Sequence, residues 1–472
     1  MSGRLSDVSP RLQTALAAGA AAALSAAVNI PRAVDFSFWQ DEVGSARVIT
    51  VSSPISMLRA VVGSENHPPG FYALGWVLDR LGVPVVWDRT ISVLAAMALS
   101  GLVVVYARRM VQLWGAALAG LVTALGWQFW RHGWELRPYS LFALTCLLFV
   151  LALEHAAEEP TRGRLGLLAG TVAAGAMTHY FFAFTLFGGL LWAYLERGRH
   201  DLRRLFLAMA VGLLPLVVWL PAFYKQFRSG GFQTNPDFSL RSSFETYGAL
   251  LVRGHVNLGL ALAVLALVLL GAVRLWRASP SGRLCALAAV VPFAACSVVW
   301  LAGPDIYTVK NLLGAAPFAG VTIAAALSAL PRPLSIAATA SAAALLVVGY
   351  AEKRGRIIPD YDRVAAALVQ EGWRESDPIV VFGPPYQLLH PLDWYLPGGR
   401  LEVATWGARP CELVFVISVG GRGRALIVNA PSRHVRRIVI ARLPYRPGLV
   451  READSRGGSL LATRAAPCAR VA

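Results

Sequence analysis

Long apolar runs alternate with short polar segments along the first 350 residues of the chain. A helix that crosses the hydrocarbon core of a membrane needs about 20 mostly apolar residues. The pattern therefore indicates a polytopic α-helical membrane protein with about 11 transmembrane helices. The predicted spans lie near residues 12–30, 90–106, 113–130, 138–154, 165–179, 181–195, 205–224, 257–273, 284–302, 311–330 and 334–350.

Two apolar segments need a separate interpretation. Residues 12–30 come after Arg4 and Arg11, and an apolar run preceded by basic residues is typical of a signal peptide. This run is long, however, and no clear Ala-x-Ala cleavage site precedes Pro31. We therefore expect an uncleaved membrane anchor. Residues 67–86, "HPPGFYALGWVLDRLGVPVV", are apolar enough for a span. Their Trp, Tyr, Asp and Arg side chains instead favour a helix at the outer membrane interface, within a first outer loop of residues 31–89.

The arginine clusters predict the orientation of the chain. The segments "ARRM", "TRGR", "ERGRHDLRR" and "RLWRASPSGR" all lie between apolar runs, and cytoplasmic loops are the ones enriched in Lys and Arg. Placing these segments inside gives a cytoplasmic N-terminus, and an odd number of spans then places the C-terminus outside. We expect a multi-pass protein of the plasma membrane.

The composition changes after residue 350. The stretch "DYDRVAAALVQEGWRESDPIVVF" reads as an amphipathic helix, a turn and a short strand, and "ELVFVISV" and "HVRRIVIARL" read as further strands. The sequence therefore predicts a membrane domain of residues 1–350 and a small extracytoplasmic α/β domain of residues 351–472.

Composition and charge narrow the class of protein. Of 472 residues, 56% are hydrophobic and the mean hydropathy is +0.54, which excludes an ordinary soluble fold. The net charge of +17 comes mostly from arginines in short clusters between apolar runs, so we expect contact with membrane lipids and no nucleic-acid binding. The five cysteines form no CxxC motif and indicate no metal cluster, although a bridge between Cys411 and Cys468 remains open if both lie outside the cytoplasm.

Polar residues collect at the predicted outer ends of the spans. The stretch "FSFWQDEVGSARV" places two adjacent carboxylates, Asp41 and Glu42, among aromatic and apolar residues. Carboxylates and cations that meet at a membrane surface suit a reaction between a lipid-borne phosphate and a polar acceptor. A carboxylate can take the proton of an acceptor hydroxyl, while Arg or Lys holds the phosphate.

Six motifs in order resemble the pattern of GT-C membrane glycosyltransferases. The nearest resemblance is to the protein O-mannosyltransferase and aminoarabinose-transferase-like branch, glycosyltransferase family 39-like, and it covers roughly residues 12–350. The motifs are "DFSFWQDEVGSAR", "NHPPGFYALGW", "RHGWELRPYSLFAL", "THYFFAF", "LPLVVWLPAFYKQF" and "YTVKNLLGAAPF".

The resemblance implies a role for each site residue. Asp41 matches the first carboxylate of the family's acidic pair, the catalytic base, and Glu42 is its supporting partner. His67 and Arg137 match positions beside the donor phosphate. Lys310 stands where relatives often have Arg followed by Tyr, and Asn311 departs from that pattern. The remaining candidates are Lys225 and Arg228 as phosphate ligands, and Glu135, Tyr139, His179 and Tyr180 as residues that line the site.

The implied function is that of an inverting glycosyltransferase. It would move a hexose or pentose, such as mannose or arabinose, from a polyprenyl-phosphate donor to a hydroxyl of a glycan, lipid or protein acceptor. Such a displacement requires no nucleotide, metal or other cofactor. Two alternatives stay open: a transporter or flippase of lipid-linked saccharides, and a membrane scaffold whose outer domain binds a partner. For each polar residue, a helix cap or an interfacial anchor is the competing interpretation.

Overall fold

The chain divides into two units. A computed structural model places residues 1–34 and 48–354 in the first unit, and residues 35–47 and 355–472 in the second. The residues that the structure describes are 9–229, 239–251, 258–302, 306, 308–353, 362, 365–366, 369, 391, 393–396 and five strands near the C-terminus.

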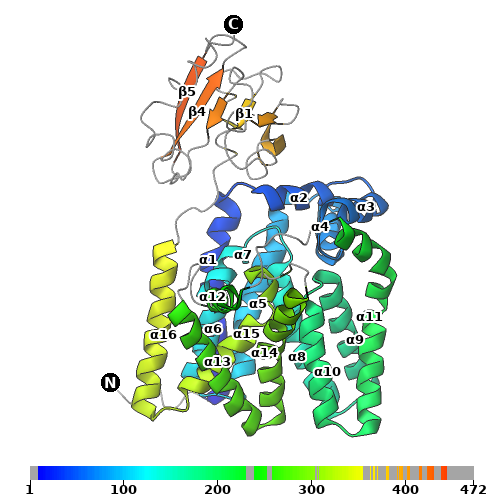
Figure 1. The fold of residues 1–472 in the computed structure, drawn as a ribbon, viewed down its shortest axis with the longest axis vertical. Helices are drawn as coiled ribbons and strands as arrows, with labels where there is room; N and C mark the ends of the chain where they lie inside the picture. The colour runs from blue at the N-terminus through cyan, green and yellow to red at the C-terminus, as the bar shows by residue number, and fades with distance from the viewer. Residues whose placement is uncertain are drawn as a thin grey trace. The chain divides into compact units, whose positions relative to one another are not determined.

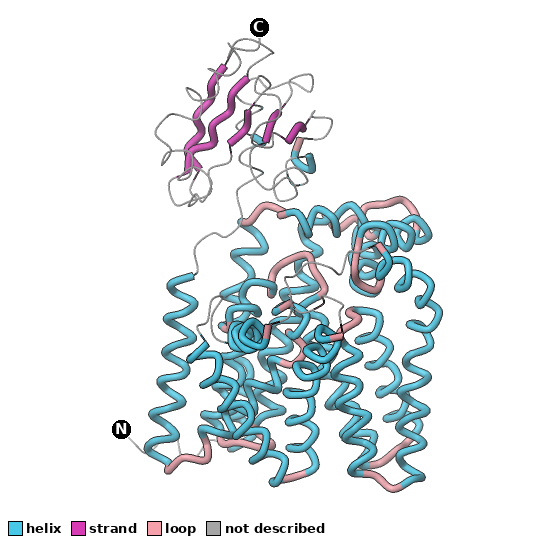
Figure 2. Tube along the Cα trace, viewed as in Figure 1, coloured by secondary structure: helices cyan, strands magenta, loops and turns pink. Residues whose placement is uncertain are grey.

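The first unit is a bundle of helices (Figures 1 and 2). The helices of the chain are α1 (Pro10–Asp35), α2 (Gln40–Ile49), α3 (Pro54–Ser64), α4 (Gly70–Arg80), η1 (Val85–Asp88), α5 (Arg89–Ala107), α6 (Leu113–Leu125), α7 (Trp127–His132), α8 (Tyr139–Glu158), α9 (Arg162–Thr178), α10 (Phe182–Glu196), α11 (Arg199–Arg228), α12 (Leu240–Leu251), α13 (Leu258–Ala278), α14 (Pro280–Leu301), η2 (Val309–Leu312), α15 (Ala316–Leu327) and α16 (Arg332–Lys353).

Every predicted apolar run falls on a helix. Within the described residues, seven helices are long and apolar enough to cross a membrane, namely α1, η1 with α5, α8, α11, α13, α14 and α16. Helices α6, α10 and α15 are apolar but shorter, and α9 has 17 residues. The chain is therefore a multi-pass membrane protein, while eleven crossings and their orientation stay predictions.

Two predicted spans are interrupted. The run at 113–130 becomes α6 and α7, because Gly126 adopts an extended ψ of 139° between them. The run at 311–330 begins with the short 3-10 helix η2, and its α-helix starts only at Ala316. Both interruptions place short helices and loops beside the polar motifs of the sequence.

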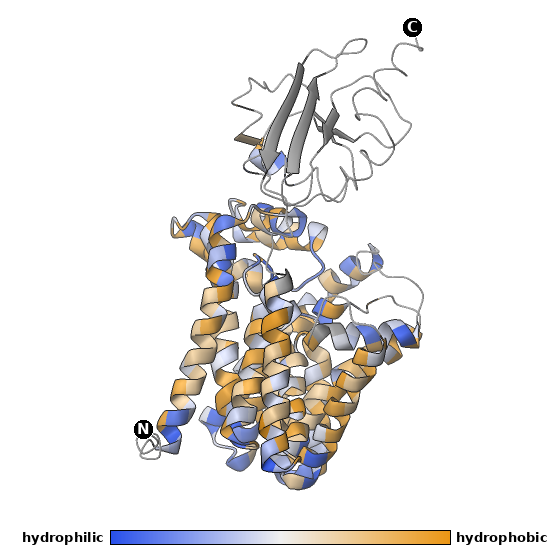
Figure 3. Cartoon of the chain, turned by 90° about the vertical axis from the view of Figure 1, so that its left-hand side faces the viewer, coloured by the Kyte–Doolittle hydropathy of each residue, from blue (hydrophilic) through white to orange (hydrophobic). Residues whose placement is uncertain are grey.

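The bundle packs tightly inside and is apolar outside. A Cβ atom on Gly271 of α13 would lie 1.7 Å from the backbone oxygen of Thr322 of α15, so only glycine permits this approach. Hydrophobic residues predominate along the helices (Figure 3), and many large apolar side chains are exposed, among them Val218 of α11 at 83%. Such a surface suits hydrocarbon rather than water.

Helices α3 and α4 lie across one end of the bundle (Figures 1 and 3). Helix α4 has 11 residues and so is about 16 Å long, which is too short to cross a membrane. The segment predicted to be interfacial is thus a short helix and not a span.

The second unit contains a mixed five-stranded sheet in the order β2-β1-β3-β4-β5. Strand β1 runs parallel to β2 and β3, whereas β3, β4 and β5 are antiparallel. The segments read as strands from the sequence contain β1, β3 and β5. The strands are β1 (Ile379–Val381), β2 (Leu401–Val403), β3 (Val414–Val416), β4 (Gly423–Asn429) and β5 (Arg437–Leu443). The proposed Cys411 to Cys468 bridge lies outside the described residues.

Hydrogen bonds and an ion pair within the second unit join residues 35–47 to its C-terminal part. The Ser37 hydroxyl hydrogen bonds to the Asp362 carboxylate. The backbone N–H of Phe38 donates to the Tyr395 hydroxyl at 2.7 Å, and Arg47 forms an ion pair with Asp393. The segment that carries the acidic pair is thus held by residues more than 300 positions away.

Candidate active site

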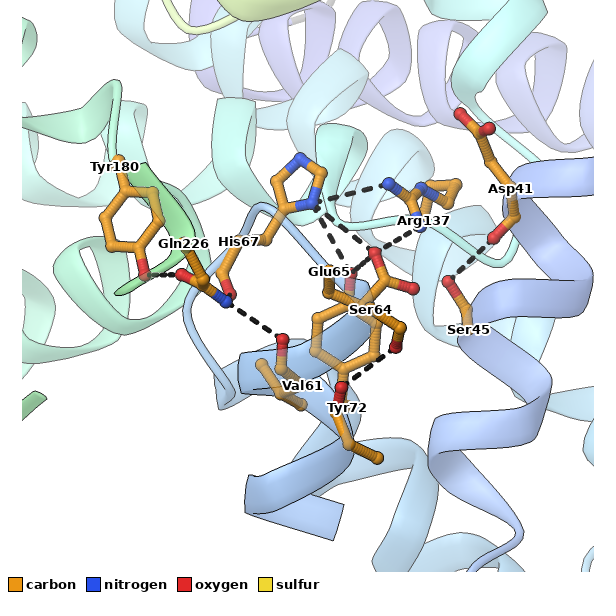
Figure 4. A network of polar contacts seen from close by, with 11 residues as sticks. Asp41, Ser45, Val61, Ser64, Glu65, His67, Tyr72, Arg137, Tyr180 and Gln226 are labelled. Carbon is orange, nitrogen blue, oxygen red and sulfur yellow. Dashed lines mark hydrogen bonds and ion pairs between the residues drawn. The ribbon is translucent and has the colours of Figure 1, made fainter. Parts of the chain in front are cut away.

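A buried ion pair is the centre of a polar cluster in the first unit (Figure 4). Arg137 Nη1 donates to Glu65 Oε2 at 2.8 Å, and the Tyr72 hydroxyl donates to the same oxygen at 2.8 Å. His67 Nδ1 lies 3.3 Å from Arg137 Nη2. Because the Glu65 and Arg137 side chains are 4% and 7% exposed, the charges are compensated by each other and by these polar neighbours.

The local sequence fixes both partners of the pair. Glu65 is the C-terminal cap residue of α3, and "HPPG" then turns the chain into α4. A Cβ atom on Gly70 would lie 2.5 Å from the Met177 backbone oxygen, so this glycine lets the turn pack against the end of α9. On the other side, Ser92 Oγ donates to the Arg137 backbone oxygen at 3.0 Å, just before α8 begins.

Aromatic and histidine rings pack around the ion pair. The Tyr139 ring centroid lies 5.7 Å from that of His67, 4.9 Å from that of His132 and 6.0 Å from that of His179. The His67 and His179 centroids are 4.8 Å apart, and the His179 ring stacks on Phe142 at 4.4 Å. The structure therefore brings together the predicted residues His67, Arg137, Tyr139 and His179.

The Tyr139 hydroxyl and His179 Nε2 are buried hydrogen-bond donors of this cluster that lack a partner among the described residues. The Phe181 backbone N–H donates to His179 Nδ1 at 3.3 Å, so the proton of the neutral ring is assigned to Nε2. Buried polar groups are nearly always hydrogen-bonded, and an unsatisfied donor costs free energy. Both groups are therefore suited to hold the oxygen atoms of a ligand.

Lys310 adds a second cation to the cluster. Its Nζ atom lies 5.4 Å from the centroid of the Tyr139 ring, and the Arg137 guanidinium carbon lies 5.9 Å from the same centroid. Lys310 belongs to η2, where Asn311 Nδ2 donates to the Ile306 backbone oxygen at 2.9 Å. Asn311, where the sequence departs from the motif it resembles, thus holds the loop that carries Lys310 in place.

Glu135 pairs with His132, a residue of the same "RHGWELRPYSLFAL" motif. His132 Nδ1 lies 2.6 Å from Glu135 Oε2, and both side chains are buried. Through His132, the pair reaches the Tyr139 ring. Glu135 therefore contacts the cluster indirectly.

Tyr180 belongs to a network that ties the His67 loop to α11. Its hydroxyl donates to Gln226 Oε1 at 2.5 Å and accepts from Trp219 Nε1 at 2.8 Å. Gln226 Nε2 in turn donates to the Val61 backbone oxygen of α3 at 2.9 Å (Figure 4) and to the His67 backbone oxygen at 3.5 Å. Tyr180 thus stabilises the position of the loop that precedes α4.

Lys225 and Arg228 lie on the exposed side of the same helix. Gln226 is buried, whereas both cations are exposed, and no hydrogen bond or ion pair joins them to the cluster within the described part of the chain. Their role as phosphate ligands stays a prediction. Exposed cations of this kind can also bind anionic lipid headgroups.

Asp41 and Glu42 begin α2 and belong to the second unit. The Trp39 backbone N–H donates to Glu42 Oε2 at 3.4 Å, which is the second half of a capping box. Glu42 is fully buried, while Asp41 is half-buried and its backbone oxygen accepts from Ser45 Oγ. The geometry therefore gives Glu42 a structural role in addition to the supporting role predicted for it.

Three polar residues of the site were missed in the sequence: Glu65, Tyr72 and Gln226. The stretch "ENHPP" contains a carboxylate two residues before His67, which is a signal that was available. No signal in the sequence pointed to Gln226, because whether its side chain faces the interior depends on the rotation of α11 about its axis. Among the described residues, no group of three His, Cys, Asp or Glu side chains is placed to hold a metal ion.

Burial and neighbouring cations keep the clustered histidines neutral. Burial lowers the pKa of His67 well below its ordinary value, and Arg137 and Lys310 lower it further. Burial also lowers the pKa of His179 well below its ordinary value, with added contributions from His67 and the same two cations. Neutral imidazoles offer one N–H donor each without adding charge.

These pKa shifts predict a loss of stability in mild acid. Below about pH 6.5 the unfolded chain binds protons at His67 and His179 that the folded protein does not bind. The free energy of unfolding should therefore fall by up to about 1.4 kcal/mol per pH unit for each histidine. Thermal unfolding of the detergent-solubilised protein between pH 5 and 8 measures this slope. His179→Gln should reduce this slope, and an equal slope in the variant and in the unmodified protein would contradict the prediction.

No family model and no curated protein matches the chain. Its fold is similar to that of ArnT from Cupriavidus metallidurans bound to undecaprenyl phosphate, with a TM-score of 0.57 at 14% identity over 83% of this chain and 86% of that one. The apo structure of ArnT gives a TM-score of 0.50 at 15% identity over 78% and 81%. The archaeal oligosaccharyltransferase AglB from Archaeoglobus fulgidus gives 0.49 at 12% identity over 85% and 65%. The likeness to ArnT confirms the predicted GT-C fold.

Proposed function

We propose that this protein is a membrane glycosyltransferase that takes a sugar from a polyprenyl-phosphate donor and transfers it to an acceptor hydroxyl on the outer face of the membrane. The observation that carries the proposal is the pair of buried, unsatisfied donors, Tyr139 Oη and His179 Nε2, beside the cations Arg137 and Lys310. The fold is shared with an ArnT structure that is bound to undecaprenyl phosphate.

The cluster is suited to the phosphate of a lipid-linked sugar. Arg137 and Lys310 supply positive charge, and Tyr139 and His179 supply neutral donors to the remaining phosphate oxygens. His67 adds a third neutral donor: Arg137 Nη2 faces its Nδ1 atom at 3.3 Å, so the proton of the ring is assigned to Nε2. These groups would stabilise the negative charge that develops on the phosphate as the sugar departs.

Asp41 is the proposed base of the transfer step. It removes the proton from the acceptor hydroxyl, whose oxygen attacks the anomeric carbon of the donor sugar. The bond between that carbon and the phosphate oxygen breaks, and its electron pair leaves with the polyprenyl phosphate. One direct displacement inverts the anomeric configuration. Glu42 supports Asp41 by holding the first turn of α2.

The remaining predicted residues have supporting roles in this proposal. Glu135 orients His132, and Tyr180 holds the His67 loop through Gln226. Lys225 and Arg228 attract the anionic headgroup of the lipid donor at the membrane surface. Proposed partners are therefore the lipid-linked sugar, membrane lipids and a glycan, lipid or protein that carries the acceptor hydroxyl.

Incubation of the purified protein with a panel of polyprenyl-phosphate sugars tests the proposal. The panel contains hexosyl and pentosyl donors with a radiolabelled sugar, and release of polyprenyl phosphate is followed together with sugar transfer to membrane extracts. We expect one donor to be consumed, with inversion of the anomeric configuration. If labelled donors cross proteoliposome membranes but are never cleaved, the flippase alternative replaces the proposal. If none is bound, a scaffold role becomes the better explanation.

A further inference from the structure

Glu65 places a negative charge inside the site proposed to bind phosphate. Its Oε2 atom accepts hydrogen bonds from Arg137 and from Tyr72, both at 2.8 Å, and lies 3.9 Å from His67 Nδ1. The side chain is 4% exposed, so water screens its charge little. The Glu65 carboxylate therefore already balances the single positive charge of Arg137 before any phosphate binds.

The cluster combines two cations with one anion and two neutral rings. Arg137 and Lys310 are cations, Glu65 is an anion, and His67 and His179 are neutral because burial lowers the pKa of each. Glu65 therefore lowers the formal charge of this set by one unit. Other titratable groups on the adjoining elements include His132, whose pKa burial lowers, and Arg59, Tyr72, Asp79, Arg80, Arg89, Arg131, Glu135, Tyr139, Lys225 and Arg228.

The donor and the product of the proposed reaction differ in charge. A sugar linked through a phosphodiester carries one negative charge on its phosphate. Once the sugar has left, the lipid carries a phosphomonoester with a second pKa of about 6, so it bears about −1.5 to −2 charges at pH 7. In surroundings that hold little water, the Glu65 carboxylate repels the doubly charged product more strongly than the singly charged donor, so it weakens product binding relative to donor binding.

We propose that Glu65 is a built-in counter-anion that matches the site to the singly charged phosphodiester and thereby promotes release of the doubly charged monoester product. The inference rests on the proposed function. Glu65 acts through Arg137 and through the charge of the site, so it is a positioning and selectivity residue rather than a catalytic one. The carboxylate also keeps the Arg137 side chain in place before the donor arrives.

Binding of two lipids to Glu65→Gln tests the inference. The probes are undecaprenyl phosphate and its methyl diester, and their dissociation constants are measured in detergent by calorimetry at pH 8 and pH 5. At pH 8 the variant should bind the monoester about tenfold more tightly than the unmodified protein does, whereas diester affinity should change by less than about threefold. At pH 5, where both lipids carry about one charge, the preference should disappear.

Two further variants separate charge from hydrogen bonding. Glu65→Asp keeps the negative charge and should keep the ratio of monoester to diester affinity of the unmodified protein. Tyr72→Phe removes one hydrogen bond to Glu65 without changing any charge, so it should also keep that ratio. A purely structural role for Glu65 would instead lower the affinity for both lipids in all three variants, with the same ratio at both pH values.

The unmodified protein provides a test that does not depend on how the variants fold. Its affinity for the monoester, relative to the diester, should fall between pH 5 and pH 8 as the monoester gains its second charge. A constant or rising ratio overturns the inference. If the unmodified protein binds neither lipid, the proposed function itself fails, and the two failures are thereby distinguished.

Discussion

Asp41→Asn is expected to lower the rate of sugar transfer by about 10²–10⁴-fold while the protein still folds and binds its lipid donor. An amide has the shape of the carboxylate but cannot take the proton of the acceptor hydroxyl. Asn also suits the first turn of a helix, so α2 should form normally. The measurement is transfer of a labelled sugar by protein in proteoliposomes, with thermal unfolding and donor binding recorded in parallel.

Glu42→Gln is the matched control for Asp41→Asn. The Gln side-chain oxygen still accepts the hydrogen bond from the Trp39 backbone N–H, so the capping box is kept. We expect a much smaller loss of transfer than in Asp41→Asn. Full activity in Asp41→Asn would move the base elsewhere, and equal losses in the two variants would show that the carboxylates act as a pair.

Arg137→Met is expected to lower the affinity for polyprenyl phosphate by about 10²-fold or more and to destabilise the fold. The first effect follows because the phosphate loses its guanidinium partner. The second follows because Glu65, 4% exposed, would keep a buried charge without its ion-pair partner, at a cost of about 3–5 kcal/mol. Calorimetric binding and thermal unfolding measure the two effects separately.

The double variant Arg137→Met with Glu65→Gln separates binding from stability. Removal of both charges should restore part of the stability, since no uncompensated carboxylate remains, and part of the binding of polyprenyl phosphate, since the charge of the site returns to its original sum while the guanidinium donors stay lost. Arg137→Lys should retain more of both properties, although an ammonium cannot reproduce the two-atom contact of Arg137 with Glu65 and His67. Normal lipid binding by Arg137→Met would place the phosphate elsewhere in the protein.

The membrane class and the order of the helices could be predicted from the sequence alone. Apolar runs of about 20 residues have few alternatives to a spanning helix, because the backbone must satisfy its own hydrogen bonds in lipid. Residues 67–86 are apolar enough for a span, and it was their Trp, Tyr, Asp and Arg side chains that indicated an interfacial helix; α4 is a short helix. Length and hydropathy are properties of local sequence, so they need no knowledge of the fold.

Part of the candidate site could also be predicted, because certain polar residues are unusual in apolar surroundings. Four of the predicted site residues lie up to 112 positions apart, namely His67, Arg137, Tyr139 and His179. Each lies in a short motif that could be identified in the sequence without knowledge of the others. Their rings and charges meet in the structure. The exposed Lys225 and Arg228 show the limit of this reasoning, since the sequence does not tell which face of α11 turns inward.

Only the tertiary structure decided which polar groups are partners and which are left without one. Glu65 pairs with Arg137 across 72 positions, and no periodicity or local motif encodes that contact. The tautomer of His179 and the unsatisfied donors beside it depend on the packing of the α9–α10 turn against α8. The sequence by itself thus determined that the chain lies in a membrane and carries acids and bases at its helix ends. The fold decided which of those charges cancel, because burial and pairing arise from contacts between distant segments.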